Sequence, residues 1–347
     1  RKRTSAGASV SPTSSTARGS TSRATRELLK DDTFEIVTTE RLERELERVR
    51  AAAAGEIEGV FGAPSISWRV DREAANFVGA GRALLLQLAH PWVAAAIEQH
   101  SDTFAHPIGR FHRTFKLVFT LVFGTLEQSL KAARMLHQLH AGITGTLPRA
   151  AGPFPAGSPF NANGIAALRW VYATLIDTSV ICHALVLPPL TPAEREQFFE
   201  ESCLFAGFFG ISREHLPGSW SEFCGYVHTF LESDVLIVTG AARSMAHRLL
   251  SDEAHWLRAP PSYMALTAEL LPPRLRDAFG LPYGSRERAA AARLRARLRA
   301  IYTYLPSRLR HVGPYHEARE RIAGRSSPRL VTRLSNRAWI GQSMLPR

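Results

Sequence analysis

Between residues 72 and 145, large apolar side chains recur every three or four positions along the chain. This period is that of one face of an α-helix, whereas a strand would show strict alternation. We predict a helix over 72–99 that bends at Pro91, because proline removes a backbone hydrogen bond. Pro107 suits the first turn of a second helix, over 107–123. The chain is therefore organised around packed helices.

A third helix is indicated by Gly124, which ends the second, and by a capping box that runs from Thr125 to Gln128. The same spacing predicts further helices over 39–54, 164–187, 192–209, 219–250, 263–271 and 286–305. No run alternates as a strand would, and the short apolar segment 235–240 lies inside a longer helical pattern. The prediction is an all-α protein, a single bundle of nine or ten helices.

A chain of 347 residues, 45% of them hydrophobic, is long enough to bury a large core. Its cysteines, Cys182, Cys203 and Cys224, are scattered and show no Cys-x-x-Cys or Cys/His spacing. We therefore expect no disulfide framework and no structural zinc, and a reducing, cytoplasmic setting. The fifteen uncharged residues between Arg82 and Glu98 are too few for a membrane-spanning helix, which needs about 20.

The net charge of +12 lies at the two ends of the chain. Residues 1–30 hold seven Lys and Arg against one Glu, and residues 286–347 hold fifteen Arg against three Glu, which leaves the middle at −6. This distribution argues against nucleic-acid binding by the main domain. We predict a disordered basic Ser/Thr/Arg-rich tail over 1–30, a helical domain over 31–323 and a flexible basic tail over 324–347. The first tail also has the composition of an organelle transit peptide, which keeps organelle targeting open.

Two glycines, Gly79 and Gly81, stand in the predicted helix 72–99. Each costs about 1 kcal/mol relative to alanine in a helix, so they need a reason. They permit the close approach of another backbone or of a flat ligand. The motif is not the dinucleotide-binding Gly-x-Gly-x-x-Gly, because position 84 is Leu84 and no strand precedes it.

Polar side chains interrupt the apolar faces of the next two helices. Arg110 and Thr114 lie along one face of 107–123, with Arg113 beside it. An arginine on such a face needs water or an anionic partner, which is either a carboxylate of the protein or a bound anionic group. His137 and His140 follow on the third helix, with His140 near the centre of an apolar face. A histidine there is either a satisfied core residue or an axial ligand of haem iron.

Six segments occur in order that resemble the family of bacterial rubber oxygenases (latex-clearing proteins) and the fungal oxygenase MpaB. They are SWRVDREAANFVGAGRALLLQLAHPWVAAAIEQHS (67–101), GRFHRTFKLVFTLVFGT (109–125), LHQLHAGITG (136–145), ALRWVYATLIDT (167–178), LTPAERE (190–196) and LRDAFGLPYG (275–284). The resemblance implies a globin-like helical core that holds haem b and acts with O₂ on a hydrophobic substrate, an isoprenoid or another alkene. It makes 31–323 an oxygenase-like domain.

The resemblance also implies roles for single residues. His140 matches the histidine that binds the haem iron, so it is the expected metal ligand, and His137 is expected to support it. The distal Arg-x-x-Lys-Thr segment falls on Arg110, Arg113 and Thr114, the expected catalytic residues. Arg113 stands where the rubber oxygenases have lysine, which leaves the distal iron ligand open. Small apolar residues are expected to line a substrate tunnel, with Ala89, Phe119 and Phe123 as candidates.

Two further classes of function are weighed beside the oxygenase. A non-enzymatic lipid or isoprenoid carrier would dock on membranes through the basic amphipathic helix 286–305, although that helix equally suits a cover over the core with a solvated outer face. A di-iron carboxylate bundle would need paired Glu-x-x-His motifs on its helices, and the sequence has none.

Overall fold

The computed structural model describes residues 35–100, 107–251 and 260–346, together with Thr25 and Leu28. Within this part of the chain, the side chains of residues 107, 108, 110 and 251 are outside the description. The predicted N-terminal tail lies almost entirely outside the described residues.

Helices make up nearly all of the described secondary structure, which confirms the all-α prediction. The α-helices are α2 (Thr39–Ala51), α3 (Ile66–Asp71), α4 (Ala80–Leu88), α5 (Pro91–His100), α6 (Pro107–Phe123), α7 (Leu126–Ala141), α8 (Ile165–Val186), α9 (Pro192–Gly207), α10 (Trp220–Glu232), α11 (Gly240–Ser251), α12 (Pro261–Leu270), α13 (Pro273–Ala278), α14 (Ser285–Ile301), α15 (Ser307–Arg310), α16 (Gly313–Ile322) and α17 (Leu330–Ile340). Short 3₁₀ helices are η1 (Ala74–Gly79), η3 (Arg213–His215) and η4 (Tyr302–Tyr304). Strands β1 (Thr144–Thr146) and β2 (Pro159–Asn161) form one antiparallel pair.

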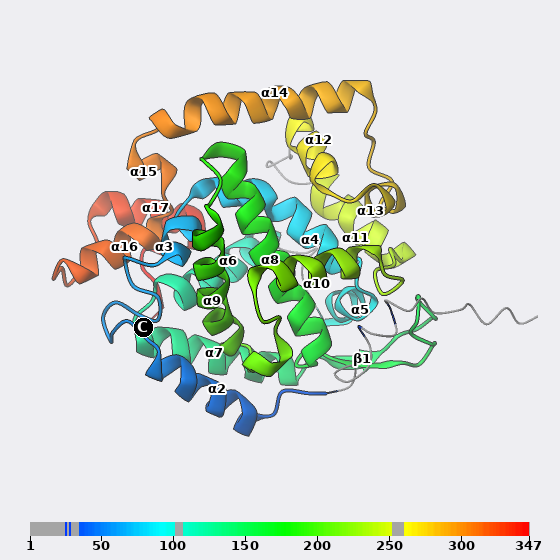
Figure 1. Ribbon diagram of the computed structural model, residues 1–347, viewed down its shortest axis with the longest axis horizontal. Coiled ribbons are helices and arrows are strands. Elements are labelled where there is room, and N and C mark those ends of the chain that lie inside the picture. The colour runs from blue at the N-terminus through cyan, green and yellow to red at the C-terminus, as the bar shows by residue number, and fades with distance from the viewer. Residues whose placement is uncertain (1–24, 26–27, 29–34, 101–106, 252–259, 347) are drawn as a thin grey trace, which may run out of the picture.

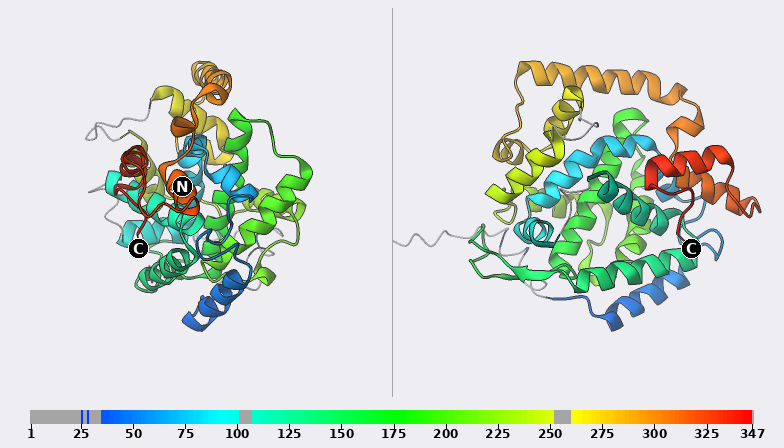
Figure 2. Two further views of the ribbon diagram at one scale, coloured as in Figure 1. Left: turned by 90° about the vertical axis from the view of Figure 1, so that its left-hand side faces the viewer. Right: turned by 180° about the vertical axis from the view of Figure 1, so that it is seen from behind.

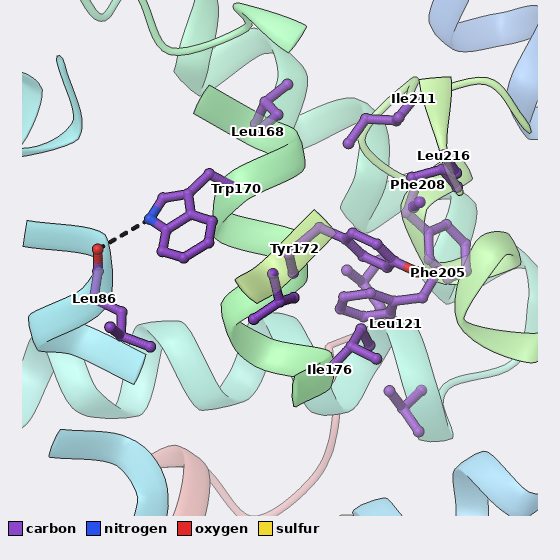
Figure 3. Close-up of a cluster of buried hydrophobic side chains, with 14 of the residues drawn as sticks. Leu86, Leu121, Leu168, Trp170, Tyr172, Ile176, Phe205, Phe208, Ile211 and Leu216 are labelled. Carbon is purple, nitrogen blue, oxygen red and sulfur yellow. Dashed lines mark hydrogen bonds between the residues drawn. The ribbon is translucent and has the colours of Figure 1, made fainter. Parts of the chain in front are cut away.

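Helix α8 runs through the middle of the bundle, with α4, α9 and α10 against it (Figure 1). Trp170 and Tyr172 on this helix are almost fully buried, and the Trp170 indole N–H donates to the Leu86 carbonyl on α4 at 3.0 Å (Figure 3). By length and composition α8 is apolar enough to cross a membrane, but 61% of its most apolar window is buried in the structure. Its hydrophobicity is thus accounted for by its central position in the core.

Helices α6 and α7 form a helical hairpin with its turn at Gly124, in which α7 lies along the lower part of the molecule and α6 lies above it (Figure 1). The predicted capping box is present, because the Thr125 side chain accepts from Gln128 N–H and the Gln128 side chain accepts from Thr125 N–H. At the turn, the buried Ser129 hydroxyl donates to the Thr120 carbonyl at 3.0 Å. The hairpin is therefore closed tightly at this end.

The predicted helix 72–99 is divided into η1, α4 and α5. Pro91 begins α5, as its missing N–H predicts. The earlier break has a tertiary cause, because Val312 N–H donates to the Arg72 carbonyl at 2.9 Å and Ala75 N–H donates to the Tyr302 hydroxyl at 3.1 Å. Backbone groups that would continue a helix are thus paired with the C-terminal part of the chain, which periodicity does not reveal.

The prediction of one long helix over 219–250 is wrong, because α10 ends at Glu232 and α11 begins at Gly240. The Arg274 guanidinium accounts for the interruption by donating to the carbonyls of Leu231, Ser233 and Leu236 at 2.7–3.0 Å. The apolar segment 235–240 is therefore an irregular connection and not part of a helix.

The structure differs from the prediction of a flexible tail over 324–347, since α17 lies within it. The buried Glu317 carboxylate accepts from the Asn336 side chain at 2.6 Å and from Leu345 N–H at 3.1 Å. Trp339 on α17 packs edge-on against Phe77 of η1. This segment completes the core beside α6 and α16 (Figure 2).

Candidate functional site

The predicted site residues on the hairpin lie at its open end, away from the turn at Gly124. With a rise of about 1.5 Å per residue, Arg113 is roughly 15 Å and His140 roughly 25 Å along their helices from that turn. Arg113 and Thr114 on α6 are exposed, and His140 on α7 is half-buried. Arg110 lies one turn before Arg113, but its side chain is outside the described residues. Both segments thus lie in the parts of α6 and α7 that are away from the turn, which we call the open end of the hairpin.

The His140 imidazole is held in its neutral form. Burial lowers the pKa of His140 from 6.5 to about 4, and repulsion from His137 lowers it further, while a hydrogen bond with the Asn163 side chain acts in the opposite direction. Asn163 is itself buried, and its side-chain amide also donates to the His137 carbonyl at 3.1 Å. The last turn of α7 is thereby fixed, with a lone pair on an uncharged imidazole.

His137 lies one turn before His140 and is also half-buried. Its Nδ1 atom is buried and has no hydrogen-bond partner among the described residues. Met135 and Leu139, on the adjoining face of α7, are 61% and 65% exposed. The last turns of α7 therefore combine the His140 imidazole and the unpartnered Nδ1 of His137 with an exposed apolar edge.

The two helical glycines are explained by helix packing. A Cβ on Gly79 would lie 2.3 Å from the Thr178 side chain and 2.4 Å from the Cys182 sulfur, both on α8. A Cβ on Gly81 would lie 2.8 Å from the Thr267 hydroxyl on α12. Each glycine thus permits another helix to approach closely, and Gly79 in addition lines the cavity described next.

A cavity of about 140 Å³ lies on the other side of α6, between that helix, α3, η1 and α8. Its wall is mainly aromatic and aliphatic and includes Phe77, Phe115, Phe119 and Trp339. Of the three residues predicted to line a tunnel, Phe119 lies in this wall, and Ala89 and Phe123 do not. The volume is close to the roughly 150 Å³ of an apolar cavity that binds benzene in another protein.

Thr114 connects the cavity with the open end of the hairpin. It lines the cavity and is also exposed to solvent, so the cavity opens beside it. Of the predicted catalytic residues with a described side chain, Thr114 faces this cavity and Arg113 does not.

Asp71, at the end of α3, is a cavity residue that sequence reasoning missed. It is half-buried and lines the cavity. Burial raises the pKa of Asp71 from 3.8 to about 7, and the charge of Glu201 raises it further. No hydrogen bond or ion pair joins its carboxylate to another described residue. A short polar residue at a helix end gave no signal for this, because its burial depends on the packing of distant helices.

Asn76 on η1 is the second unsatisfied polar group of the cavity. Its side-chain amide donates to the Val70 carbonyl at 2.9 Å, next to Asp71, and its Oδ1 atom is buried without a partner among the described residues. The cavity thus combines a mainly apolar wall with several polar side chains, Asp71 and Asn76 among them.

A buried ion pair supports the α8 side of the cavity. The Arg82 guanidinium on α4 donates to Asp177 and to the Thr178 hydroxyl, both at 2.6 Å, and to the Leu270 carbonyl at 3.0 Å. Arg82 is 3% exposed. The interaction satisfies Asp177 and fixes the turn of α8 that carries Thr178 and Ser179 into the cavity wall.

The family model described as "ER-bound oxygenase mpaB/B'/Rubber oxygenase, catalytic domain" matches residues 68–300, which is about two thirds of the chain. The chain belongs to this family. The matched range includes α4–α8 and so contains both the hairpin and most of the cavity wall. Comparison with curated proteins and with solved structures gave no significant match.

Family membership makes the helical domain an oxygenase-type catalytic domain and places the chain, coarsely, among the oxidoreductases. Within the described part of the chain, no group of three or more His, Cys, Asp and Glu side chains could hold a metal ion. A haem needs only an axial ligand from the protein, so this finding does not bear on it.

Proposed function

We propose that this protein is a haem b-dependent oxygenase that acts with O₂ on a hydrophobic substrate, an isoprenoid or another alkene. The observation that carries the proposal is the neutral imidazole of His140 at the open end of the hairpin, within a domain of the oxygenase family. An axial imidazole must be uncharged to offer its lone pair to iron.

The residues at the open end fit a haem in their chemistry. Asn163 hydrogen-bonds to His140, as partners that orient a ligating histidine do. The exposed side chains of Met135 and Leu139 offer apolar surface beside the imidazole. The unpartnered Nδ1 of His137 offers a further hydrogen-bonding atom there. His140 would therefore hold the iron, with His137 beside it and Gly79 and Gly81 as the remaining cofactor-binding candidates.

When bound, the haem supplies the activation of O₂. The chain's own residues orient the partners and exclude water. Arg113 and the Thr114 hydroxyl are donors at the open end and would stabilise negative charge on a reacting oxygen, together with Arg110. The aromatic wall of the cavity would hold an apolar part of the substrate beside Thr114 and away from water.

The test is the absorption spectrum of the protein expressed with a haem supply, with haem b quantified chemically. We expect one haem b per chain and a Soret band that His140→Ala abolishes or shifts. His100→Ala is the matched control, because His100 lies exposed at the end of α5. A His140→Ala protein with full haem and an unchanged spectrum would refute the ligand assignment.

A second candidate, the lipid or isoprenoid carrier that docks on membranes, is favoured by one surface. Helix α14 crosses the top of the molecule (Figure 1), and its outward arginines include Arg293 and Arg297. After it, Ile301, Tyr304 and Leu309 are 56%, 86% and 68% exposed. Arginines flanking exposed apolar residues suit an anionic bilayer, whereas Leu294 and Leu298 of α14 pack inward as core cover.

Flotation with phosphatidylcholine vesicles, with and without phosphatidylserine, tests the membrane contact. Binding only to the anionic vesicles, lost in Arg293→Glu/Arg297→Glu, would support it, and no binding would contradict it. A colourless protein that carries extracted lipid would favour the carrier over the oxygenase. We propose a cytoplasmic location, with an organelle or a membrane surface as the alternatives. We also propose that the protein binds no nucleic acid.

A further inference from the structure

Helix α17 presents an apolar stripe to the solvent. Its buried residues, which recur every four positions and face the core, are Thr332, Asn336 and Ile340. The side turned away from them holds Leu330, Val331 and Leu334, which are 70%, 49% and 54% exposed. At 3.6 residues per turn, these three side chains lie within one stripe of the helix surface. Contiguous apolar surface of this kind marks an interaction site.

Arginines flank the apolar stripe along one edge. Arg333 and Arg337 are one turn apart on α17, both are exposed, and neither forms an ion pair with a described residue. Arg329, before the helix, lies 4.0 Å from a carboxylate oxygen of Glu320. The last 24 residues of the chain, 324–347, hold five arginines and no Asp or Glu. The charge of this surface is therefore complementary to an anionic partner.

The exposed apolar residues of the protein gather in this part of the chain. Of the ten large apolar residues that are exposed in the described structure, six lie within 301–334, namely Ile301, Tyr304, Leu309, Leu330, Val331 and Leu334. The end of α14, α15 and α17 lie on one side of the molecule (Figures 1 and 2). The family model ends at residue 300, so this side is built largely by the chain beyond the oxygenase-type domain.

We propose that α17 is a docking helix for an anionic lipid bilayer. Leu330, Val331 and Leu334 enter the boundary between the headgroups and the acyl chains, and Arg333 and Arg337 bind the lipid phosphates beside them. The assignment does not depend on haem. It also differs from the surface considered for the carrier, whose arginines lie on α14.

A bilayer fits this stripe better than a protein partner does. Helix α17 has 11 residues and is therefore about 16 Å long, whereas a specific protein interface buries about 800 Å² on each partner. The exposed stripe is aliphatic, while the buried centre of a protein interface is enriched in aromatic residues. A bilayer deforms around a short helix and requires no matching shape, so apolar contact together with arginines suffices.

Docking by α17 brings the opening of the cavity close to the bilayer. The His112 side chain on α6 donates to the Ala338 carbonyl on α17 at 3.2 Å, and Thr114, in the same turn of α6, marks the opening. Trp339, on α17 itself, lines the cavity. A hydrophobic molecule dissolved in the bilayer therefore has a short path to the cavity.

Flotation of the full chain with vesicles at increasing lipid concentration measures the docking. The vesicles are phosphatidylcholine with and without phosphatidylserine, and we expect the protein to bind those with phosphatidylserine. Leu330→Ser/Leu334→Ser should weaken this binding at least about tenfold, because two leucine side chains no longer leave water. Ile36→Ser is the matched control, since Ile36 is 45% exposed before α2, away from α17, and it should bind as the unchanged protein does (Figure 1).

A second variant tests the charge without altering the apolar stripe. Arg333→Gln/Arg337→Gln should weaken binding to the vesicles with phosphatidylserine at least about tenfold, since each arginine near an anionic bilayer contributes about fivefold. Arg44→Gln, at an exposed arginine on α2, is the matched control and should change nothing. Both double variants replace exposed side chains only, and thermal unfolding checks that they remain folded.

The outcomes separate this helix from the other surfaces. Absence of vesicle binding, or unchanged binding of Leu330→Ser/Leu334→Ser, would overturn the proposal. A protein that sediments as a dimer, and as a monomer in this variant, would instead assign the stripe to a second copy of the chain. Loss of binding in Arg293→Glu/Arg297→Glu alone would keep the α14 contact and refute the one at α17. A missing Soret band with α17-dependent flotation would refute the haem assignment alone.

Discussion

An ionisable group is buried both at the open end of the α6–α7 hairpin and beside the cavity that α6 lines, and burial changes the protonation of the two groups in opposite directions. At the hairpin, burial deprotonates a base, because the pKa of His140 falls from 6.5 to about 4. In the cavity, burial protonates an acid, because the pKa of Asp71 rises from 3.8 to about 7. Both groups thereby become neutral near pH 6, where each makes its least costly contact with an apolar surrounding.

The two shifts predict opposite slopes of stability over one range of pH. His140 binds fewer protons in the folded than in the unfolded state, so its contribution to stability is complete above pH 6.5 and is lost as the pH falls toward 4. Asp71 binds more protons when folded, so its contribution is complete below pH 3.8 and is lost as the pH rises through 7. The two effects offset each other in the unchanged protein.

The largest effect on the free energy of unfolding should come from the buried Arg82–Asp177 ion pair, which supports the α8 side of the cavity. Arg82→Ala leaves the partly buried Asp177 without its guanidinium partner, and breaking such a pair costs about 3–5 kcal/mol. We expect this loss in the free energy of unfolding from denaturant titration. Arg295→Ala, at the more exposed pair with Glu269, is the control and should cost less than about 1 kcal/mol. Equal effects of the two variants would show that the Arg82 pair is not the support inferred here.

Asp71→Asn removes the acid, so only the contribution of His140 to the pH dependence of stability remains. The variant should be more stable than the unchanged protein by about 4 kcal/mol at pH 8, since ionisation of the buried carboxyl no longer opposes folding. At pH 4 the difference should vanish. Denaturant titrations at several pH values measure this, and Asp277→Asn serves as the exposed control. An Asp71→Asn variant with the same stability profile as the unchanged protein would mean that Asp71 titrates normally.

His140→Gln removes the base and should have a somewhat smaller stabilising effect, which appears at low and not at high pH. At about pH 4.5 the haem-free variant should be more stable than the haem-free unchanged protein by about 2 kcal/mol, because no imidazole must be kept unprotonated. Above pH 7 this gain should disappear. Imidazole NMR signals that titrate near pH 6.5 in the folded protein would contradict the burial of His140.

The difference between the two regions also shows what sequence reveals. The hairpin could be predicted because local signals define it: Pro107 at its start, the box of Thr125 and Gln128 at its turn, and helical spacing between them. Counting residues from the turn places His140, Arg113 and Thr114 in the parts of the two helices that are away from it. Nothing local marks Asp71, since its burial depends on η1, α8, α9 and α17 meeting around it.

Long-range backbone pairing explains the predictions that were wrong. Helical periodicity alone continues past Glu232, but Arg274, about 40 residues later, occupies the carbonyls that would be its last turn. The C-terminal segment looks flexible because it is rich in arginine, yet the buried Glu317 and Asn336 fix it to the core. In both cases polar side chains, and not the hydrophobic pattern, decide the structure.

The smallest expected effect concerns how the C-terminal segment holds the cavity wall. Gly341 ends α17 with φ of 72°, two residues after Trp339, and a Cβ there would lie 2.8 Å from the His112 ring on α6. Gly280 has the same φ of 72° with open space around it. Gly280→Ala should therefore cost about 1 kcal/mol through backbone strain alone, and Gly341→Ala should cost more in thermal unfolding. If both variants lose the same stability, the contact with His112 does not constrain the end of α17.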